Sequence, residues 1–217
     1  RALRNVSMTI EPGSFTAIIG TNGSGKSTLL NGIAGTFIPD RGSIMIKDKE
    51  ISQWPEFKRA KLVGRVFQNP FAGTAAEMSI AENIVLAMRR GQVRTLKTAL
   101  NSKVKDEIAE RITMLKMGLE DRLDNPIGTL SGGQRQALTL LMATWLKPDL
   151  LLLDEHTAAL DPKSAAKVAE LTLAEQGFNG IIIFILEELL LRDEELCKGC
   201  KDQWIDNSEL INALLNL

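Results

Sequence analysis

Short runs of apolar residues, each about as long as a β-strand, are the clearest feature of the hydrophobic pattern. They occupy residues 15–19, 150–153 and 181–185, and the last two runs contain no polar residue. Residues 63–67 read as a further strand. Continuous apolar strands are typical of a parallel sheet that helices cover on both faces. Residues 29–34, which follow the first run, read as a helix. The pattern therefore predicts an α/β fold with a mainly parallel sheet.

Two stretches depart from this pattern. Residues 42–51 read as a strand with a turn, which predicts a small N-terminal antiparallel β part. Between 71 and 129 the strand signal disappears, and apolar residues recur at helical spacing, at Leu100, Val104, Ile108, Ile112 and Leu115. We therefore expect a helical subdomain at 72–129, inserted into a core formed by 1–71 and 130–217.

Composition and charge exclude several classes of protein. The chain has 217 residues, of which 44% are hydrophobic and 24% are charged, and these are ordinary values for a globular protein. Its formal net charge of −1 argues against a nucleic-acid binder, which needs clustered cations to neutralise phosphates. No apolar run approaches the roughly 18 residues that a membrane-spanning helix requires, and the first residues show no secretory signal.

A glycine-rich segment lies between the first predicted strand and the first predicted helix. Residues 20–28 read GTNGSGKST and fit the phosphate-loop pattern G-x-x-x-x-G-K-[ST] in its confirming context. Glycines allow a tight turn with inward-pointing backbone N–H groups, and the helix N-terminus adds partial positive charge. Lys26 can reach the β- and γ-phosphates, and the Ser27 hydroxyl can ligate Mg²⁺. The predicted phosphate site comprises Gly20, Thr21, Asn22, Gly23, Ser24, Gly25, Lys26, Ser27 and Thr28.

Two acidic residues, Asp154 and Glu155, end the apolar strand at 150–153. The carboxyl ends of strands in an α/β sheet border the crevice where ligands bind. Asp154 is suited to hold Mg²⁺ through water, and Glu155 can polarise an attacking water molecule. Neighbouring side chains on a strand point to opposite faces, so the two acids need not share one role.

A second glycine motif, Leu130-Ser131-Gly132-Gly133-Gln134, precedes a long helical run. Ser131 is a natural N-cap, and the two glycines leave backbone N–H groups open to an anion. One chain would then carry two phosphate-binding helix ends. A head-to-tail dimer, in which each nucleotide contacts one end from each subunit, explains this economically.

In combination, these motifs resemble those of the ATP-binding subunits of ABC transporters. The matching segments are the Walker A motif at 20–28, the Q-loop glutamine at Gln68, the signature motif at 130–134, the Walker B motif at 150–155 and the D-loop at 159–161. They stand in the order of the family, and the resemblance covers about residues 1–170. It implies a P-loop ATPase core with an inserted helical subdomain.

The resemblance also implies a set of site residues and cofactors. ATP and Mg²⁺ are the expected cofactors of a hydrolytic reaction that yields ADP and phosphate. Glu155 and Gln68 are the expected catalytic residues, and Ser27, Gln68 and Asp154 are the expected metal site. Ser131, Gly132, Gly133 and Gln134 are expected to act on the ATP of the partner subunit.

The partners follow from the same resemblance. We expect a head-to-tail, ATP-dependent homodimer that powers transport through separate transmembrane permease subunits, with a substrate-binding protein involved indirectly and no nucleic acid. The permease is expected to contact residues 69–82, and the chain to lie peripherally on the cytoplasmic face of the cell membrane. Residues 68–74 and 154–162 are similar to those of a bacterial importer group associated with amino-acid-type substrate-binding proteins.

The chain departs from the family pattern in three places. It has no tyrosine, and Phe15 lies in the predicted strand, so no residue is assigned to stack on adenine. Glu187 stands where the family has a histidine that contacts the γ-phosphate, while His156, the only histidine, lies on another loop. A carboxylate there adds negative charge and removes a hydrogen-bond donor, which predicts slow hydrolysis. The resemblance fades after about residue 171.

Two alternatives to an active transport ATPase remain. The first is a soluble ABC ATPase of DNA repair or translation, but such proteins carry long coiled coils or a second cassette. The second is a subunit that binds nucleotide with impaired hydrolysis, which the glutamate at position 187 favours. Separate measurements of ATP binding and ATP turnover distinguish these alternatives.

Overall fold

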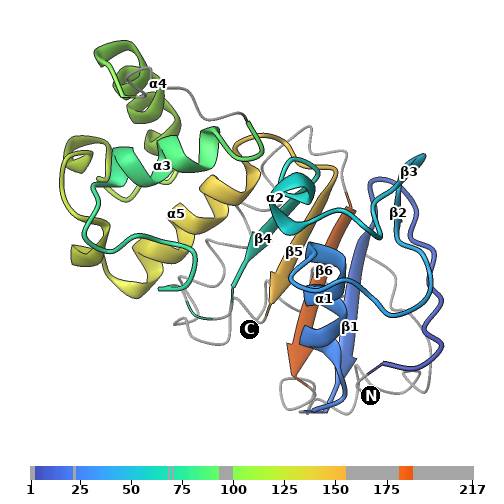
Figure 1. The fold of residues 1–217 in the computed structure, drawn as a ribbon. Helices are drawn as coiled ribbons and strands as arrows, with labels where there is room; N and C mark the ends of the chain where they lie inside the picture. Colours follow the sequence, from blue (N-terminus) through green and yellow to red (C-terminus); the bar gives the residue numbers. More distant parts are fainter. Residues whose placement is uncertain are drawn as a thin grey trace. The chain divides into compact units, whose positions relative to one another are not determined.

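The computed structural model describes residues 3–21, 23–67, 69, 71–92, 100–154 and 181–187. By its internal contacts the chain divides into two compact units, which are described separately (Figure 1). Among the described residues, the first unit comprises 3–65, 147–154 and 181–187, and the second comprises 66–146.

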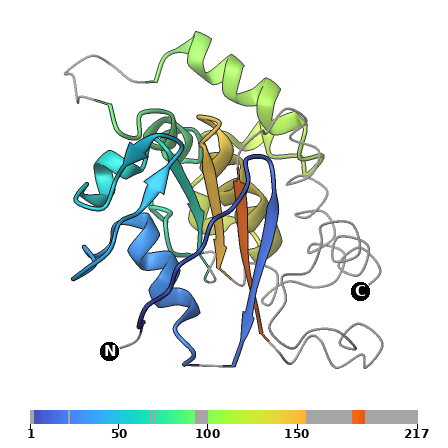
Figure 2. The same cartoon turned by 90° about the vertical axis from the view of Figure 1, so that its right-hand side faces the viewer.

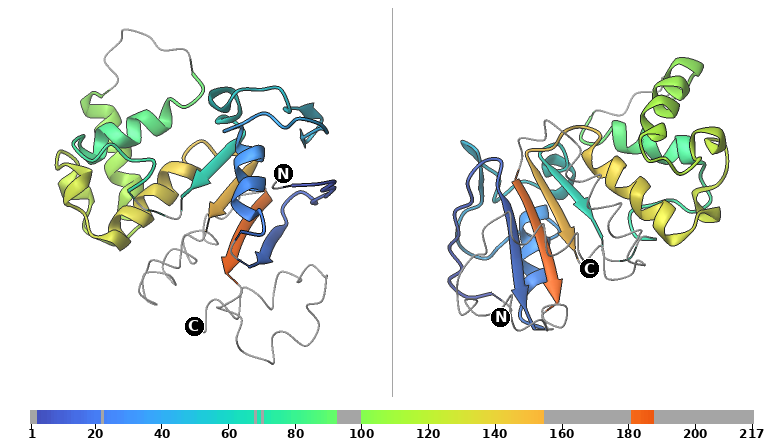
Figure 3. Two further views of the ribbon diagram at one scale, coloured as in Figure 1. Left: turned by 60° about the horizontal axis from the view of Figure 1, so that its bottom comes forward. Right: turned by 180° about the vertical axis from the view of Figure 1, so that it is seen from behind.

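The first unit is built on a four-stranded sheet. Its order is β1-β6-β5-β4, formed by β1 (Phe15–Gly20), β6 (Ile181–Glu187), β5 (Leu150–Asp154) and β4 (Val63–Val66). β6 pairs in parallel with both β1 and β5, with Ile183 opposite Thr16 on one side and Leu152 on the other. The strand arrows point the same way in Figure 3. The predicted parallel sheet is therefore confirmed.

Helix α1 (Lys26–Ala34) and a small β part complete this unit (Figure 2). β2 (Met45–Ile46) and β3 (Lys49–Glu50) form the predicted antiparallel pair, and α2 (Glu56–Arg59) follows. Apolar side chains of α1, the small β part and the sheet share one core cluster: Leu30, Ile33, Ala34, Ile46, Ile51, Val63, Leu150, Leu152 and Ile183.

Arg59 holds the C-terminal end of α1 in place. Its side chain is completely buried, and its guanidinium donates to the carbonyl oxygens of Gly32 at 2.6 Å and Ile33 at 2.9 Å. It also donates to the carbonyls of Trp54 and Ser52, each at 2.8 Å. Burial lowers the pKa of Arg59 from its ordinary value. α1 is capped by Gly35, where φ is +89° and a Cβ would lie 2.9 Å from the Arg59 side chain, so glycine is required.

The second unit is helical. It contains α3 (Ile80–Met88), α4 (Ser102–Thr113), α5 (Gly132–Thr144) and two short 3₁₀ helices, η1 (Glu120–Arg122) and η2 (Ile127–Thr129). The predicted helical periodicity is visible in the packing, because Ile108 and Ile112 of α4 are fully buried and Leu115 is nearly so. None of the helices that the described residues form is long and apolar enough to cross a membrane.

Helix α5 belongs to the core of this second unit. Its residues Ala137, Leu138, Leu141 and Met142 share a cluster with apolar residues of α3 and α4. The second unit therefore includes α5 and extends to residue 146. The sequence places the end of the helical subdomain before α5, at residue 129. The limits of 72 and 129 stay a prediction about domain organisation.

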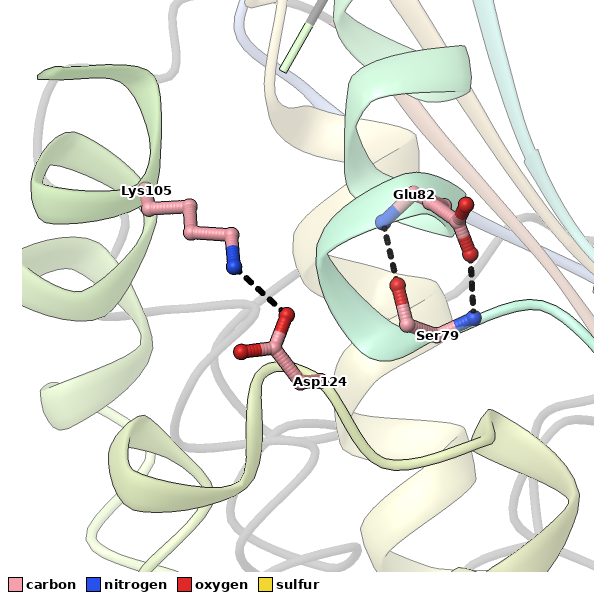
Figure 4. A network of polar contacts seen from close by, with 4 residues as sticks. All are labelled: Ser79, Glu82, Lys105 and Asp124. Carbon is pink, nitrogen blue, oxygen red and sulfur yellow. Dashed lines mark hydrogen bonds and ion pairs between the residues drawn. The ribbon is translucent and has the colours of Figure 1, made fainter. Parts of the chain in front are cut away.

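The N-terminus of α3 is capped by Ser79 and Glu82 (Figure 4). The Ser79 hydroxyl accepts from the backbone N–H of Glu82 at 3.2 Å, and the Glu82 carboxylate accepts from the backbone N–H of Ser79 at 2.7 Å. These reciprocal bonds satisfy two N–H groups that the first turn of the helix leaves open. Nearby, Lys105 of α4 pairs with Asp124 at 2.6 Å.

Candidate nucleotide-binding site

The glycine-rich loop joins β1 to α1 in the first unit. β1 ends at Gly20 and α1 begins at Lys26, so the loop lies between a strand and a helix as the sequence predicts. Gly23 and Gly25 have φ values of +81° and +99°. Side chains rarely adopt this left-handed region, so these two glycines permit the turn that leads into α1.

Lys26 is the first residue of α1, directly after this loop. Its side chain is buried, and its ammonium donates to the carbonyl oxygens of Gly20 at 2.6 Å and Thr21 at 3.1 Å. An ammonium group has three N–H donors, so a third remains for a phosphate oxygen. The loop thereby fixes a positive charge at the N-terminus of α1, where the helix dipole also favours an anion.

Ser27 and Asp154 face each other across the site. The Ser27 hydroxyl lies 3.5 Å from Oδ1 of Asp154, which ends β5 and is 9% exposed. A hydroxyl and a carboxylate are the hard oxygen donors that Mg²⁺ prefers. The two residues present therefore fit a magnesium ion, and the structure brings this predicted pair together.

Arg65 of β4 is a third member of this group that the sequence analysis did not identify. Its guanidinium lies 3.6 Å from Oδ2 of Asp154, and both side chains are 13% exposed. The available signal was a lone arginine within the predicted strand at 63–67. That signal does not show which strand lies alongside, so it did not predict the pair.

The second glycine motif opens α5 in the second unit. The Ser131 hydroxyl accepts from the backbone N–H of Gln134, and the Gln134 side chain accepts from the backbone N–H of Ser131, each at 3.2 Å. A Cβ at Gly132 would meet no atom within 4 Å, so the helix end is open there. The serine N-cap matches the sequence pattern. The sequence reasoning did not identify Gln134 as a capping residue, although S-x-x-Q is the sequence signal of such a capping box.

Arg135, the next residue of α5, contacts the segment after the Q-loop position. Its guanidinium lies 4.1 Å from the centre of the Phe71 ring and donates to the carbonyl of Ile127 at 3.0 Å. Arg135 is buried, whereas Phe71 is 60% exposed. An exposed aromatic side chain is thus held by a cation–π contact next to the start of α5.

Several predicted site residues lie outside the described residues, namely Asn22, Gln68 and Glu155, as does His156. Glu187 is described as the last residue of β6, where it pairs in register with Gly20. Its backbone therefore lies beside the start of the phosphate loop. Among the residues that the structure describes, no cluster of three or more histidine, cysteine or acidic side chains forms a further metal site.

Comparison with known proteins confirms the resemblance, and the chain belongs to the ABC transporter family, which it matches over residues 3–158. A tyrosine transport ATP-binding protein of Clostridioides difficile (strain R20291) is 45% identical over 77% of this chain and 66% of its own length. The energy-coupling factor transporter ATP-binding protein EcfA1 of Enterococcus faecalis is 34% identical over 87% of this chain and 64% of its own length.

The fold is that of the ATP-binding cassette. The crystal structure of a nucleotide-free ATP-binding cassette from an ABC transporter superimposes with a TM-score of 0.73 and 25% identity, over all of this chain and 89% of that one. The predicted fold class is therefore confirmed. The matched region spans about two thirds of the length of the two relatives, or 64–66%.

Proposed function

We propose that this chain binds ATP with Mg²⁺ and hydrolyses it as the motor subunit of an ABC transporter. The observation that carries this proposal is that the start of α1 combines an ammonium held by the loop, at Lys26, with a hydroxyl–carboxylate pair of hard oxygen ligands, Ser27 and Asp154. Family membership supports the reaction, because the relatives are named as ATP-binding proteins of transport systems.

Each residue of this site has a specific task. The backbone of residues 20–28 and the third N–H of Lys26 hold the β- and γ-phosphates, and Ser27 and Asp154 hold the metal, together with Gln68. Bound Mg²⁺ would neutralise the charge that develops on the phosphates. Glu155, placed by the sequence directly after Asp154, orients and deprotonates the attacking water.

We also propose the head-to-tail dimer that the two helix ends suggest. The Ser131 hydroxyl uses its oxygen to cap α5, so its O–H is left to donate to a phosphate of the partner's ATP. The exposed backbone at Gly132 supports the same contact, with Gly133 and Gln134 beside it. The motif then completes the nucleotide site of a second copy of the chain.

The remaining partners are proposed at the level of class. A membrane-embedded permease would contact residues 69–82, where the exposed ring of Phe71 offers an apolar contact. The chain would then lie peripherally on the cytoplasmic face of the membrane. The name of the 45% identical relative, together with the resemblance of residues 68–74, favours an importer of amino-acid-type substrates.

Replacement of Lys26 tests the nucleotide site. We expect Lys26→Ala to weaken MgATP binding by about 30- to 150-fold, because a hydrogen bond from a charged donor contributes about 2–3 kcal/mol. Titration with a fluorescent ATP analogue measures the affinity, and Lys61→Ala at an exposed position is the matched control. A thermal melt of both variants separates lost binding from lost folding. Unchanged affinity in Lys26→Ala would refute the assignment.

A second candidate function is nucleotide binding with slow or absent hydrolysis. It is favoured by the position of Glu187 at the end of β6, in register with Gly20 at the start of the phosphate loop. ATP turnover measured beside ATP affinity separates the two candidates. Tight binding with turnover near the uncatalysed rate supports the second, and robust turnover supports the first.

A further inference from the structure

The carboxylate of Asp154 has a different partner on each of its two oxygen atoms. Oδ1 lies 3.5 Å from the Ser27 hydroxyl, and Oδ2 lies 3.6 Å from a guanidinium nitrogen of Arg65. With both side chains of the ion pair only 13% exposed, solvent screens the attraction far less than it would at the surface. Arg65 therefore supplies a positive counter-charge to this carboxylate.

A second contact fixes the guanidinium. Arg65 also donates to the Thr36 hydroxyl at 3.4 Å, just beyond the C-terminal cap of α1. It is thus attached to the segment after α1 as well as to the end of β5. A planar guanidinium with several fixed donors holds a carboxylate in one orientation better than a flexible ammonium does.

We propose that Arg65 is an internal counter-cation for Asp154, which orients the carboxylate toward Ser27 and which Mg²⁺ must share when MgATP binds. This inference rests on the proposed MgATP site. A carboxylate already paired with a cation attracts a divalent ion less strongly. The expected result is a site that is ordered before the metal arrives but requires more Mg²⁺ to saturate than it would without Arg65.

The magnesium dependence of nucleotide binding tests this role. A fluorescent ATP analogue is titrated at fixed free Mg²⁺ concentrations and also in excess EDTA. We expect Arg65→Gln to lower the half-saturating Mg²⁺ about 3- to 10-fold, in proportion to the loss of one screened charge interaction, with little change in EDTA. Arg65→Lys keeps the charge and is expected to stay near the parent. Arg41→Gln, at an exposed position, controls for net charge.

A double-mutant cycle tests the pair without nucleotide. Urea unfolding in EDTA should show that Arg65→Gln destabilises the parent but has much less effect in an Asp154→Asn background, because the coupling requires both charges. An unchanged or raised half-saturating Mg²⁺ in Arg65→Gln, or additive stability effects, would overturn the proposal. A parent that binds no ATP would overturn the proposed function together with the magnesium effect, and the cycle would still decide whether the pair exists.

Discussion

Glu82 stabilises the start of α3 through a bond that depends on its charge. Its carboxylate accepts from the backbone N–H of Ser79, and this bond, followed by the contact with the Ser79 hydroxyl, lowers the pKa of Glu82 from its ordinary value. A lowered pKa in the folded state means that folding favours the ionised carboxylate of Glu82 over its protonated form. The associated stability is present above the unfolded-state pKa and is lost as the pH falls through the folded-state pKa.

This gives a pH-dependent prediction at the scale of one residue. We expect Glu82→Gln to destabilise the protein most at neutral pH, with the difference from the parent shrinking as the pH falls below about 4. Urea unfolding at several pH values measures the difference. Glu110→Gln, at an exposed position of α4, controls for the loss of one carboxylate. A difference that stays constant from neutral to acid pH would contradict the role of the ionised group.

The residue scale also shows what the sequence could predict. The phosphate loop was predictable because its chemistry lies in consecutive residues, from Gly20 to Thr28. The Ser131 N-cap was predictable for the same reason. The pair of Arg65 and Asp154 was not, because it depends on which strands lie close together, and the hydrophobic pattern carries no such information.

At the scale of elements, α5 is held at both of its ends. Ser131 and Gln134 cap its N-terminus, and arginines of neighbouring segments approach its C-terminus. Arg90 donates to the carbonyl of Ala143 at 2.8 Å, and Arg111 donates to that of Trp145 at 3.1 Å. The last turn of α5 has no basic residue of its own, so these two supply the positive charge that a helix C-terminus favours.

The segment that leads into α5 is packed tightly against the segment that precedes α3. The backbone N–H of Gly128 donates to the carbonyl of Ala76 at 2.9 Å, and a Cβ at Gly128 would lie only 2.8 Å from that oxygen. We expect Gly128→Ala to lower the free energy of unfolding by about 1–3 kcal/mol, because a backbone atom must move to admit the methyl group.

Gly132→Ala is the matched control for this prediction. Its Cβ would meet no atom within 4 Å, and alanine is favoured over glycine in a helix. Urea unfolding should therefore show a loss of stability in the first variant and none in the second. Equal changes in the free energy of unfolding would contradict the prediction, because the contact between a Cβ at position 128 and the Ala76 carbonyl would then cost no stability.

At the scale of the whole molecule, the phosphate loop and the signature motif belong to different units. Lys26 and Asp154 lie in the first unit, and Ser131 lies in the second. Each unit has its own apolar core, so each can keep its half of the proposed chemistry intact. The helical periodicity predicted α4, but the sequence did not reveal that the apolar face of α5 packs against α3, because periodicity does not identify the partner of a face.

A catalytic glutamate variant tests the dimer. We expect Glu155→Gln to keep ATP affinity within a few-fold of the parent, to abolish turnover and to accumulate a dimer, since ATP then stays between the two copies. Light scattering should show the mass doubling with ATP and not with ADP. Lys26→Ala, whose ATP affinity is expected to fall about 30- to 150-fold, is the control that should stay monomeric at an ATP concentration that saturates only the parent. Rapid turnover in Glu155→Gln would exclude this residue as the catalytic base.

The burial of Arg59 has a consequence for how the first unit unfolds locally around the end of α1. One guanidinium bonds to carbonyl oxygens of α1 and of the segment at 52–54, so the last turn of α1 cannot separate from that segment without exposing an unpaired cation. Local fraying is therefore replaced by a larger cooperative opening. The amide protons of Gly35 and Thr36, which both bond to the carbonyl of Asn31, would then exchange with solvent at the rate of that larger event.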